Sequence, residues 1–117
     1  MPLPTPHELV TTHGARTPEQ YADLLGFEVK RVVTSPMLPG VTVLSAFQAT
    51  RTILLYRPAL AQLAAQRREP LMRLEQWHIA HELYHGLSHF QGISSWRVRE
   101  TEADLWADEL LTLVPAG

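Results

Sequence analysis

The chain of 117 residues contains no cysteine and no excess of positive charge. Without cysteine there is neither a disulfide nor a thiolate ligand, so a metal site must use histidine, aspartate or glutamate. The formal charge of −2 and the isoelectric point near 6.3 provide no basic field, and we expect no direct nucleic-acid partner. The local Arg67-Arg68 pair is interpreted as part of a solvated surface.

Long hydrophobic runs are also missing. No apolar stretch approaches the ~20 residues of a membrane-spanning helix, and residues 1–6 have neither the basic nor the apolar segment of a secretory signal. We therefore expect no membrane partner and a cytoplasmic location. The length is that of one domain, spanning residues 1–117, which can bury a sufficient core without disulfides.

The apolar pattern predicts an α+β fold in which helices precede and follow a small sheet. A capping box of Thr17 and Gln20 begins one helix and Gly26 ends it. Its apolar face is expected to consist of Tyr21, Leu24 and Leu25. Further helices are predicted over residues 7–13, 58–66, 74–90 and 96–113, and strands over 27–34, 41–47 and 52–56. The last two strands should form a hairpin, in a three-stranded sheet that we expect to be mostly antiparallel.

The sequence W-H-I-A-H-E-L-Y-H at residues 77–85 carries the strongest chemical signal. On a helix, His81 and His85 lie about 40° apart and one turn from each other, so both imidazoles can reach one cation. Glu82 lies about 100° round the helix from His81, where it can hold a water molecule as a general base. The H-E-x-x-H motif therefore predicts a zinc site.

The other side of this helix is apolar, so we expect the helix to be buried with a polar stripe facing a cavity. The apolar side carries Ile79, Ala80, Leu83, Leu87 and Phe90, and the polar stripe carries His78, His81, Glu82, His85 and His89. Surface histidines on a two-sided helix are the alternative interpretation. His7 and His13 lie about 240° apart on their own helix and do not form such a pair.

The final helix should supply the third ligand, because catalytic zinc is held by three protein groups and keeps one open position. Its apolar stripe consists of Trp96, Ala103, Trp106, Ala107, Leu110 and Leu111. Glu100 lies about 50° from the centre of this stripe and Glu102 about 110°, which favours Glu100. Asp104 could accept a hydrogen bond from the free ring nitrogen of a liganding histidine. Glu102 as the ligand, or acids that only form a solvated face, are the alternatives.

These residues resemble the ImmA/IrrE family of small bacterial zincin-like metallopeptidases. That family shows A-H-E-L-G-H, a further histidine four residues on, and then E-x-x-A-x-x-F-A-x-x-L-L. Here the corresponding stretches are A-H-E-L-Y-H at residues 80–85, His89, and E-T-E-A-D-L-W-A at residues 100–107 followed by Leu110 and Leu111. Tyr84 departs from the pattern, since it stands where the family has glycine and adds bulk where substrate or a neighbouring loop could lie.

The resemblance implies a minimal zincin-like fold, a zinc ion held by His81, His85 and Glu100, and Glu82 as the catalytic base. It also implies a substrate that is a regulatory protein, such as a helix-turn-helix repressor or an antitoxin. Because the chain ends soon after the second motif, we expect any regulation to come from separate proteins.

Donors to the tetrahedral oxyanion remain open among His89, Tyr56 and Arg97. A substrate peptide could add itself to an exposed sheet edge, at strand 41–47 or strand 52–56. The alternative function is a non-catalytic binding module, in which a metal only joins two helices and the protein acts by binding a co-encoded regulator.

Overall fold

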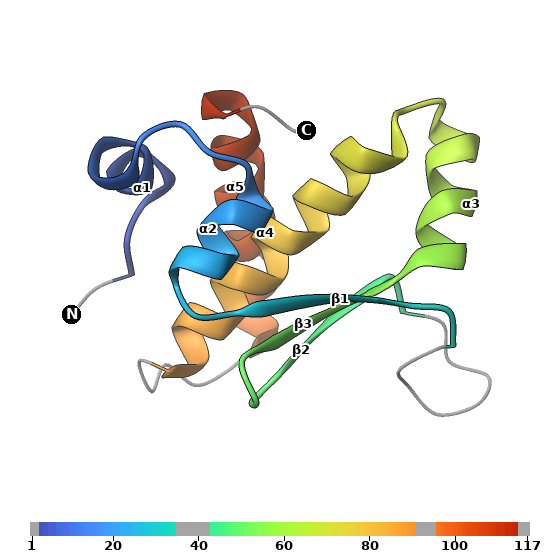
Figure 1. Cartoon of the computed structure of the whole chain (residues 1–117), viewed down its shortest axis with the longest axis horizontal. Helices are drawn as coiled ribbons and strands as arrows, with labels where there is room; N and C mark the ends of the chain where they lie inside the picture. The colour runs from blue at the N-terminus through green and yellow to red at the C-terminus, as the bar shows by residue number, and fades with distance from the viewer. Residues whose placement is uncertain (1–2, 35–42, 91–95, 115–117) are drawn as a thin grey trace.

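The computed structural model describes residues 3–34, 43–90 and 96–114 and, within residues 96–99, the backbone alone. This part of the chain is α+β, as predicted, and is shown in Figure 1. In chain order its elements are α1 (Pro6–His13), α2 (Pro18–Leu24), β1 (Glu28–Val32), β2 (Ser45–Gln48), β3 (Thr52–Tyr56), α3 (Arg57–Arg67), α4 (Leu71–Phe90) and α5 (Trp96–Leu113). Arg97 lies in α5, but its side chain is outside the described part.

Local sequence signals account for the first two helices. Thr5 with Glu8 begins α1, and Thr17 with Gln20 begins α2, each pair forming the reciprocal side-chain to backbone bonds of a capping box. The apolar face predicted for α2 is partly wrong, because Leu24 is 47% exposed. The helix instead buries Tyr21 and Ala22, and Leu24 lies about 110° from the centre of that face.

The sheet is mixed, so the expectation of a mostly antiparallel sheet is wrong. Its strand order is β1-β3-β2, with β3 parallel to β1 and antiparallel to β2. The third strand, T-I-L-L-Y, is buried from Thr52 to Leu55 and takes the centre, whereas the charged β1 strand takes one edge. The predicted strand 41–47 begins only at Ser45 in the structure, and residues 41 and 42 lie outside the described residues.

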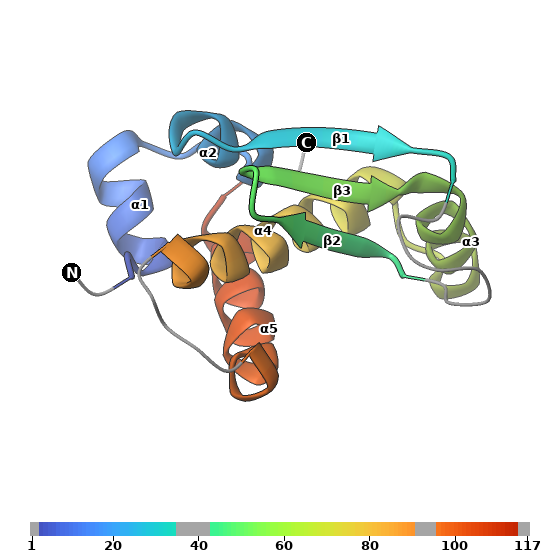
Figure 2. The same cartoon turned by 90° about the horizontal axis from the view of Figure 1, so that it is seen from below.

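Helix α4 is the element on which the others converge. It begins at Leu71, directly after Pro70 and one turn earlier than predicted, and packs against α2, α3, α5, β2 and β3. Figure 2 shows it running along the sheet, with α5 crossing beneath it. Its fully buried residues Ile79, Ala80 and Leu83 join the core. Among the described helices, none is long and apolar enough to cross a membrane.

Gly86 allows the sheet to approach α4 closely. A Cβ atom at this position would lie 2.5 Å from Cε1 of Phe27 and 3.1 Å from Cε2 of Phe47. We expect Gly86→Ala to lower the free energy of unfolding. The overpacking cost of about 1–3 kcal/mol exceeds the helical preference of ~1 kcal/mol that alanine brings. Urea denaturation followed by circular dichroism measures the effect.

The matched control is Gly86→Ala in a Phe27→Leu background, where the shorter side chain removes the contact. In that background the alanine should cost less or become stabilising. A rise in the urea midpoint for Gly86→Ala alone would contradict the close approach.

Candidate metal centre

Two imidazoles of α4 form the base of the candidate centre. His81 and His85 are one turn apart, their Nε2 atoms are 3.1 Å apart, and their ring centroids are separated by 4.7 Å. The His81 side chain is 9% exposed and that of His85 is 14% exposed. The apolar side of α4 faces the core, so the helix itself turns both rings toward the same space.

Helix α5 brings Glu100 to these rings. Its Oε1 lies 2.6 Å from Nε2 of His85, and its Oε2 lies 3.5 Å from Nε2 of His81. In a tetrahedral zinc site with bonds of 2.0–2.1 Å, ligand atoms are about 3.3 Å apart. The three side chains offer ligand atoms that all lie within 4.8 Å of one another, so they could hold a metal ion. The Glu100 side chain is 46% exposed, which leaves the cluster open to solvent on one side.

Asp104 lies one turn beyond Glu100 and faces the far side of the His81 ring. Its Oδ1 is 2.9 Å from Nδ1 of His81, within ion-pair distance, although the two atoms are not aligned as a hydrogen bond. Trp77 stacks on the same imidazole at 5.4 Å with an interplanar angle of 26°. A metal on Nε2 would leave the proton on Nδ1, where the Asp104 carboxylate could orient it. The carboxylate beside Nδ1 of His81 and a donor set of two imidazoles and one carboxylate therefore fit a catalytic type of metal site.

Glu82 lies beside the cluster and is buried, with 7% of its surface exposed. Its Oε2 accepts a hydrogen bond of 2.7 Å from Oγ of Ser45, the first residue of β2. Burial raises the pKa of Glu82 above 4.5, and the nearby Glu100 carboxylate acts in the same direction. The Ser45 bond and the charges of His81 and His85 oppose this rise in pKa.

His78, one turn before Glu82, is also drawn into this network. Its Nδ1 lies 3.1 Å from Oγ of Ser45, and only 9% of the residue is exposed. Burial lowers the pKa of His78 to about 4, and the positive charges of His81 and Arg67 add to the effect. The imidazole is therefore neutral at pH 7.

Apart from His85, the side chains of this candidate centre line one cleft of about 630 Å³ between β2, α4 and α5. It is lined by Val43, Leu44, Ser45, Ala46, Trp77, His78, His81, Glu82, Glu100 and Asp104. Metal-ligand candidates, a buried carboxylate and apolar wall residues thus share a single open space, which is the usual composition of a small-molecule or peptide site.

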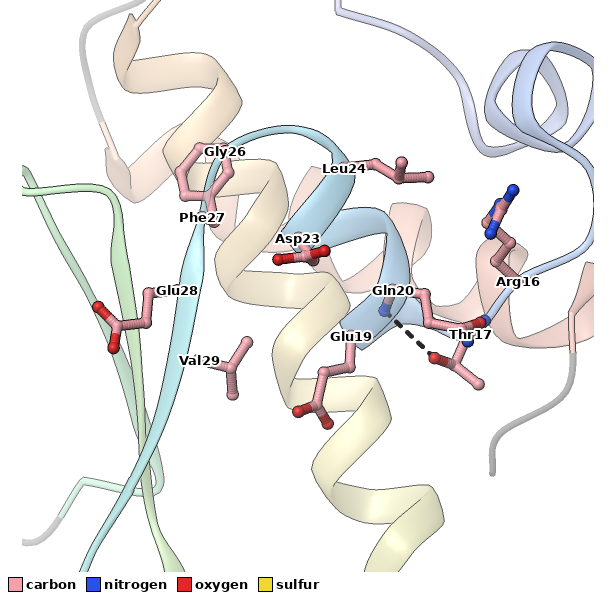
Figure 3. A pocket seen from close by; sticks show the side chains of 10 residues that line it. All are labelled: Arg16, Thr17, Glu19, Gln20, Asp23, Leu24, Gly26, Phe27, Glu28 and Val29. Carbon is pink, nitrogen blue, oxygen red and sulfur yellow. Dashed lines mark hydrogen bonds between the residues drawn. The ribbon is translucent and has the colours of Figure 1, made fainter.

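A larger hollow, of about 790 Å³, lies between α2 and β1 and is shown in Figure 3. Its polar groups serve the fold. Thr17 and Gln20 cap α2, along the dashed line in the figure, and Glu19 is paired with Arg31 at 2.8 Å. We therefore place the candidate site in the smaller cleft, although the hollow has the larger volume.

Other candidate residues lie elsewhere. Within the described residues, Tyr56 and His89 do not line the cleft, and the ring of His89 packs 5.6 Å from that of Phe47. Glu102, the alternative ligand, instead accepts a hydrogen bond of 2.5 Å from the hydroxyl group of Tyr84. Tyr84, which was expected to add bulk where substrate or a neighbouring loop could lie, is 5% exposed and packs against α5.

Sequence reasoning missed Ser45, which contacts Glu82 from 37 residues away in the chain. A single serine at the start of a strand carries no local signal of such a contact. Comparison of the chain with protein-family models, with curated proteins and with solved structures finds no match.

We predict that Zn²⁺ raises the melting temperature of the wild-type protein and that Glu100→Gln reduces this rise. A ligand present at 1,000 times its dissociation constant stabilises the folded state by about 4 kcal/mol, and loss of a charged ligand atom weakens binding. Calorimetric titration with Zn²⁺, Co²⁺ and Mn²⁺ measures the affinities and the selectivity.

The matched control is Glu109→Gln, which removes an exposed carboxylate from the same helix outside the cluster. It should bind metal as the wild type does. Equal affinities for the wild type and Glu100→Gln would rule out Glu100 as a ligand.

The lowered pKa of His78 predicts a loss of stability in acid. Between about 6.5 and about 4 the unfolded chain binds a proton at His78 that the folded chain does not, so the free energy of unfolding falls as the pH falls. The loss from this group is at most about 3 kcal/mol. Urea titrations at pH 7 and pH 4.5 in EDTA should show a smaller difference for His78→Gln than for the wild type. Equal differences would contradict the assignment.

Proposed function

We propose that this protein is a zinc-dependent metallopeptidase with a zincin-like fold, which hydrolyses a peptide bond in a regulatory protein. The observation that carries the proposal is the convergence of His81, His85 and Glu100, with Glu82 lining the same cleft as His81 and Glu100. The resemblance of residues 78–111 to the ImmA/IrrE family also supports it. The same resemblance supports a helix-turn-helix repressor or an antitoxin as the substrate.

In this proposal His81, His85 and Glu100 hold the ion. Zinc, when bound, polarises the scissile carbonyl group and lowers the pKa of a bound water toward ~7. Glu82 accepts the proton of the attacking water and then transfers it to the leaving amine, so the carboxylate is regenerated after each turnover. Burial supports this role, because it raises the pKa of the Glu82 carboxyl group, and a carboxylate with a raised pKa is a stronger base.

The arrangement of the sheet also supports a peptide substrate. Strand β2 borders the cleft and, within the described residues, is an edge strand that pairs with β3 alone. An extended peptide could add to its free edge through main-chain hydrogen bonds. The sequence suggested two strands to which a substrate peptide could add, and of these strand 41–47 remains the candidate. The strand 52–56 is excluded, because β3 is paired on both sides.

The decisive experiment compares the wild type with Glu82→Gln. The substitution keeps the size of the side chain and removes the base, so we expect normal zinc content and a fall in kcat of about 10²–10⁴-fold. Cleavage is measured on a quenched-fluorescence peptide library of mixed sequence and on the regulator encoded beside this chain, with and without a chelator.

Glu109→Gln, on the exposed side of α5, is the control and should cleave as the wild type does. If zinc-loaded wild type cleaves no faster than Glu82→Gln, the peptidase proposal fails. Undiminished binding of the regulator by Glu82→Gln, with no cleavage by either protein, would favour the non-catalytic module.

A further inference from the structure

Glu82, Ser45 and His78 form a continuous hydrogen-bonded chain between α4 and β2. Oγ of Ser45 lies 2.7 Å from Oε2 of Glu82 and 3.1 Å from Nδ1 of His78. Glu82 and His78 are four residues apart on α4, so they lie on the same side of the helix, and Ser45 bridges them from the strand above. All three residues line the cleft.

The hydrogen-bond donors in this network can be assigned from the chemistry of the three groups. A serine hydroxyl has one proton, which Ser45 donates to the Glu82 carboxylate. Its second partner must then donate to the serine oxygen, which requires the proton of the His78 ring to be on Nδ1. The neutral imidazole therefore adopts one tautomer, and it orients the hydroxyl toward Glu82.

This hydrogen-bond network restricts the rotation of the Glu82 carboxylate group. The terminal torsion of a glutamate is broad, so burial alone does not fix the direction of its two oxygens. Ser45 is held in the sheet by its pairing with Leu55, and it engages only Oε2 of Glu82. Within the described residues Oε1 has no hydrogen-bond partner, and it is left for chemistry in the cleft.

We propose that Ser45 and His78 are positioning residues, which hold Oε2 of Glu82 against β2 and so direct Oε1 toward the water at the metal centre. The catalytic importance of this pair rests on the proposed peptidase function, whereas the contact itself does not. Neither residue belongs to the H-E-x-x-H motif or to the candidate ligand set.

The kinetic test compares Ser45→Ala with Ser45→Thr. Orienting partners of active-site groups are typically worth 10–100-fold, so we expect the alanine variant to lose about that factor in kcat with KM and zinc content unchanged. Threonine retains the hydroxyl and should restore most of the activity. His78→Phe, which cannot donate, should lower kcat in the same way. Thr50→Ala, which removes an exposed hydroxyl on the β2–β3 turn, is the matched control.

A double-mutant cycle tests the contact without any substrate. Urea midpoints are measured in EDTA for Ser45→Ala, for Glu82→Met and for the double variant. If Ser45 holds Glu82, the two shifts do not add, because each single substitution removes the same hydrogen bond. Additive shifts would overturn the proposal whatever the activity of the protein.

The two experiments separate the two proposals. If the shifts in EDTA are not additive and the zinc-loaded wild type cleaves nothing, the peptidase function is refuted and the positioning contact remains in place. Cleavage by the wild type, with kcat unchanged in Ser45→Ala, would leave the peptidase function in place and overturn the positioning role.

Discussion

The packing of α5 against α4 is the constraint on which the candidate centre depends, because it carries Glu100 to the two histidines. Ala103 and Ala107 are fully buried, and their small side chains let the two helices approach closely. Two hydrogen bonds between α4 and α5 fix the rotation of α5 about its own axis. The Tyr84 hydroxyl donates to Glu102, and Nε1 of Trp77 donates to Asp108 at 2.7 Å. Tyr84, at the position where the resembled family has glycine, thus helps to hold the helix that bears the third candidate ligand.

The polar stripe of α4 is difficult to explain by stability. His78, His81 and Glu82 are each less than a tenth exposed, and burying such groups costs free energy that hydrogen bonds recover only in part. Replacing buried ionic groups by apolar residues of similar volume often leaves the stability of a protein unchanged or increases it. A fold that retains these groups where a helix faces an open cleft is therefore better explained by a function at the cleft.

Features that depend on neighbours in the chain could be predicted from the sequence. The capping box of Thr17 and Gln20, the i, i+4 spacing of His81 and His85, and the preference for Glu100 over Glu102 are each properties of one helix, and the structure places them as those properties suggest. The parallel pairing of β1 with β3 and the Ser45 contact depend on residues far apart, and no local pattern reports them. The continuous apolar run of β3 did carry a signal, because a strand buried on both faces belongs at the centre of a sheet.

That apolar run also decides which strand borders the cleft. With residues 52–55 buried, β3 must lie between two neighbours, and the hairpin then leaves the shorter, less buried β2 at the edge beside α4. If β3 were the edge strand, its leucines would face solvent and its free hydrogen-bonding groups would invite aggregation. The burial that stabilises the sheet therefore also places Ser45 over Glu82 and leaves β2, in the part of the chain that the structure describes, as an edge strand beside the candidate metal centre.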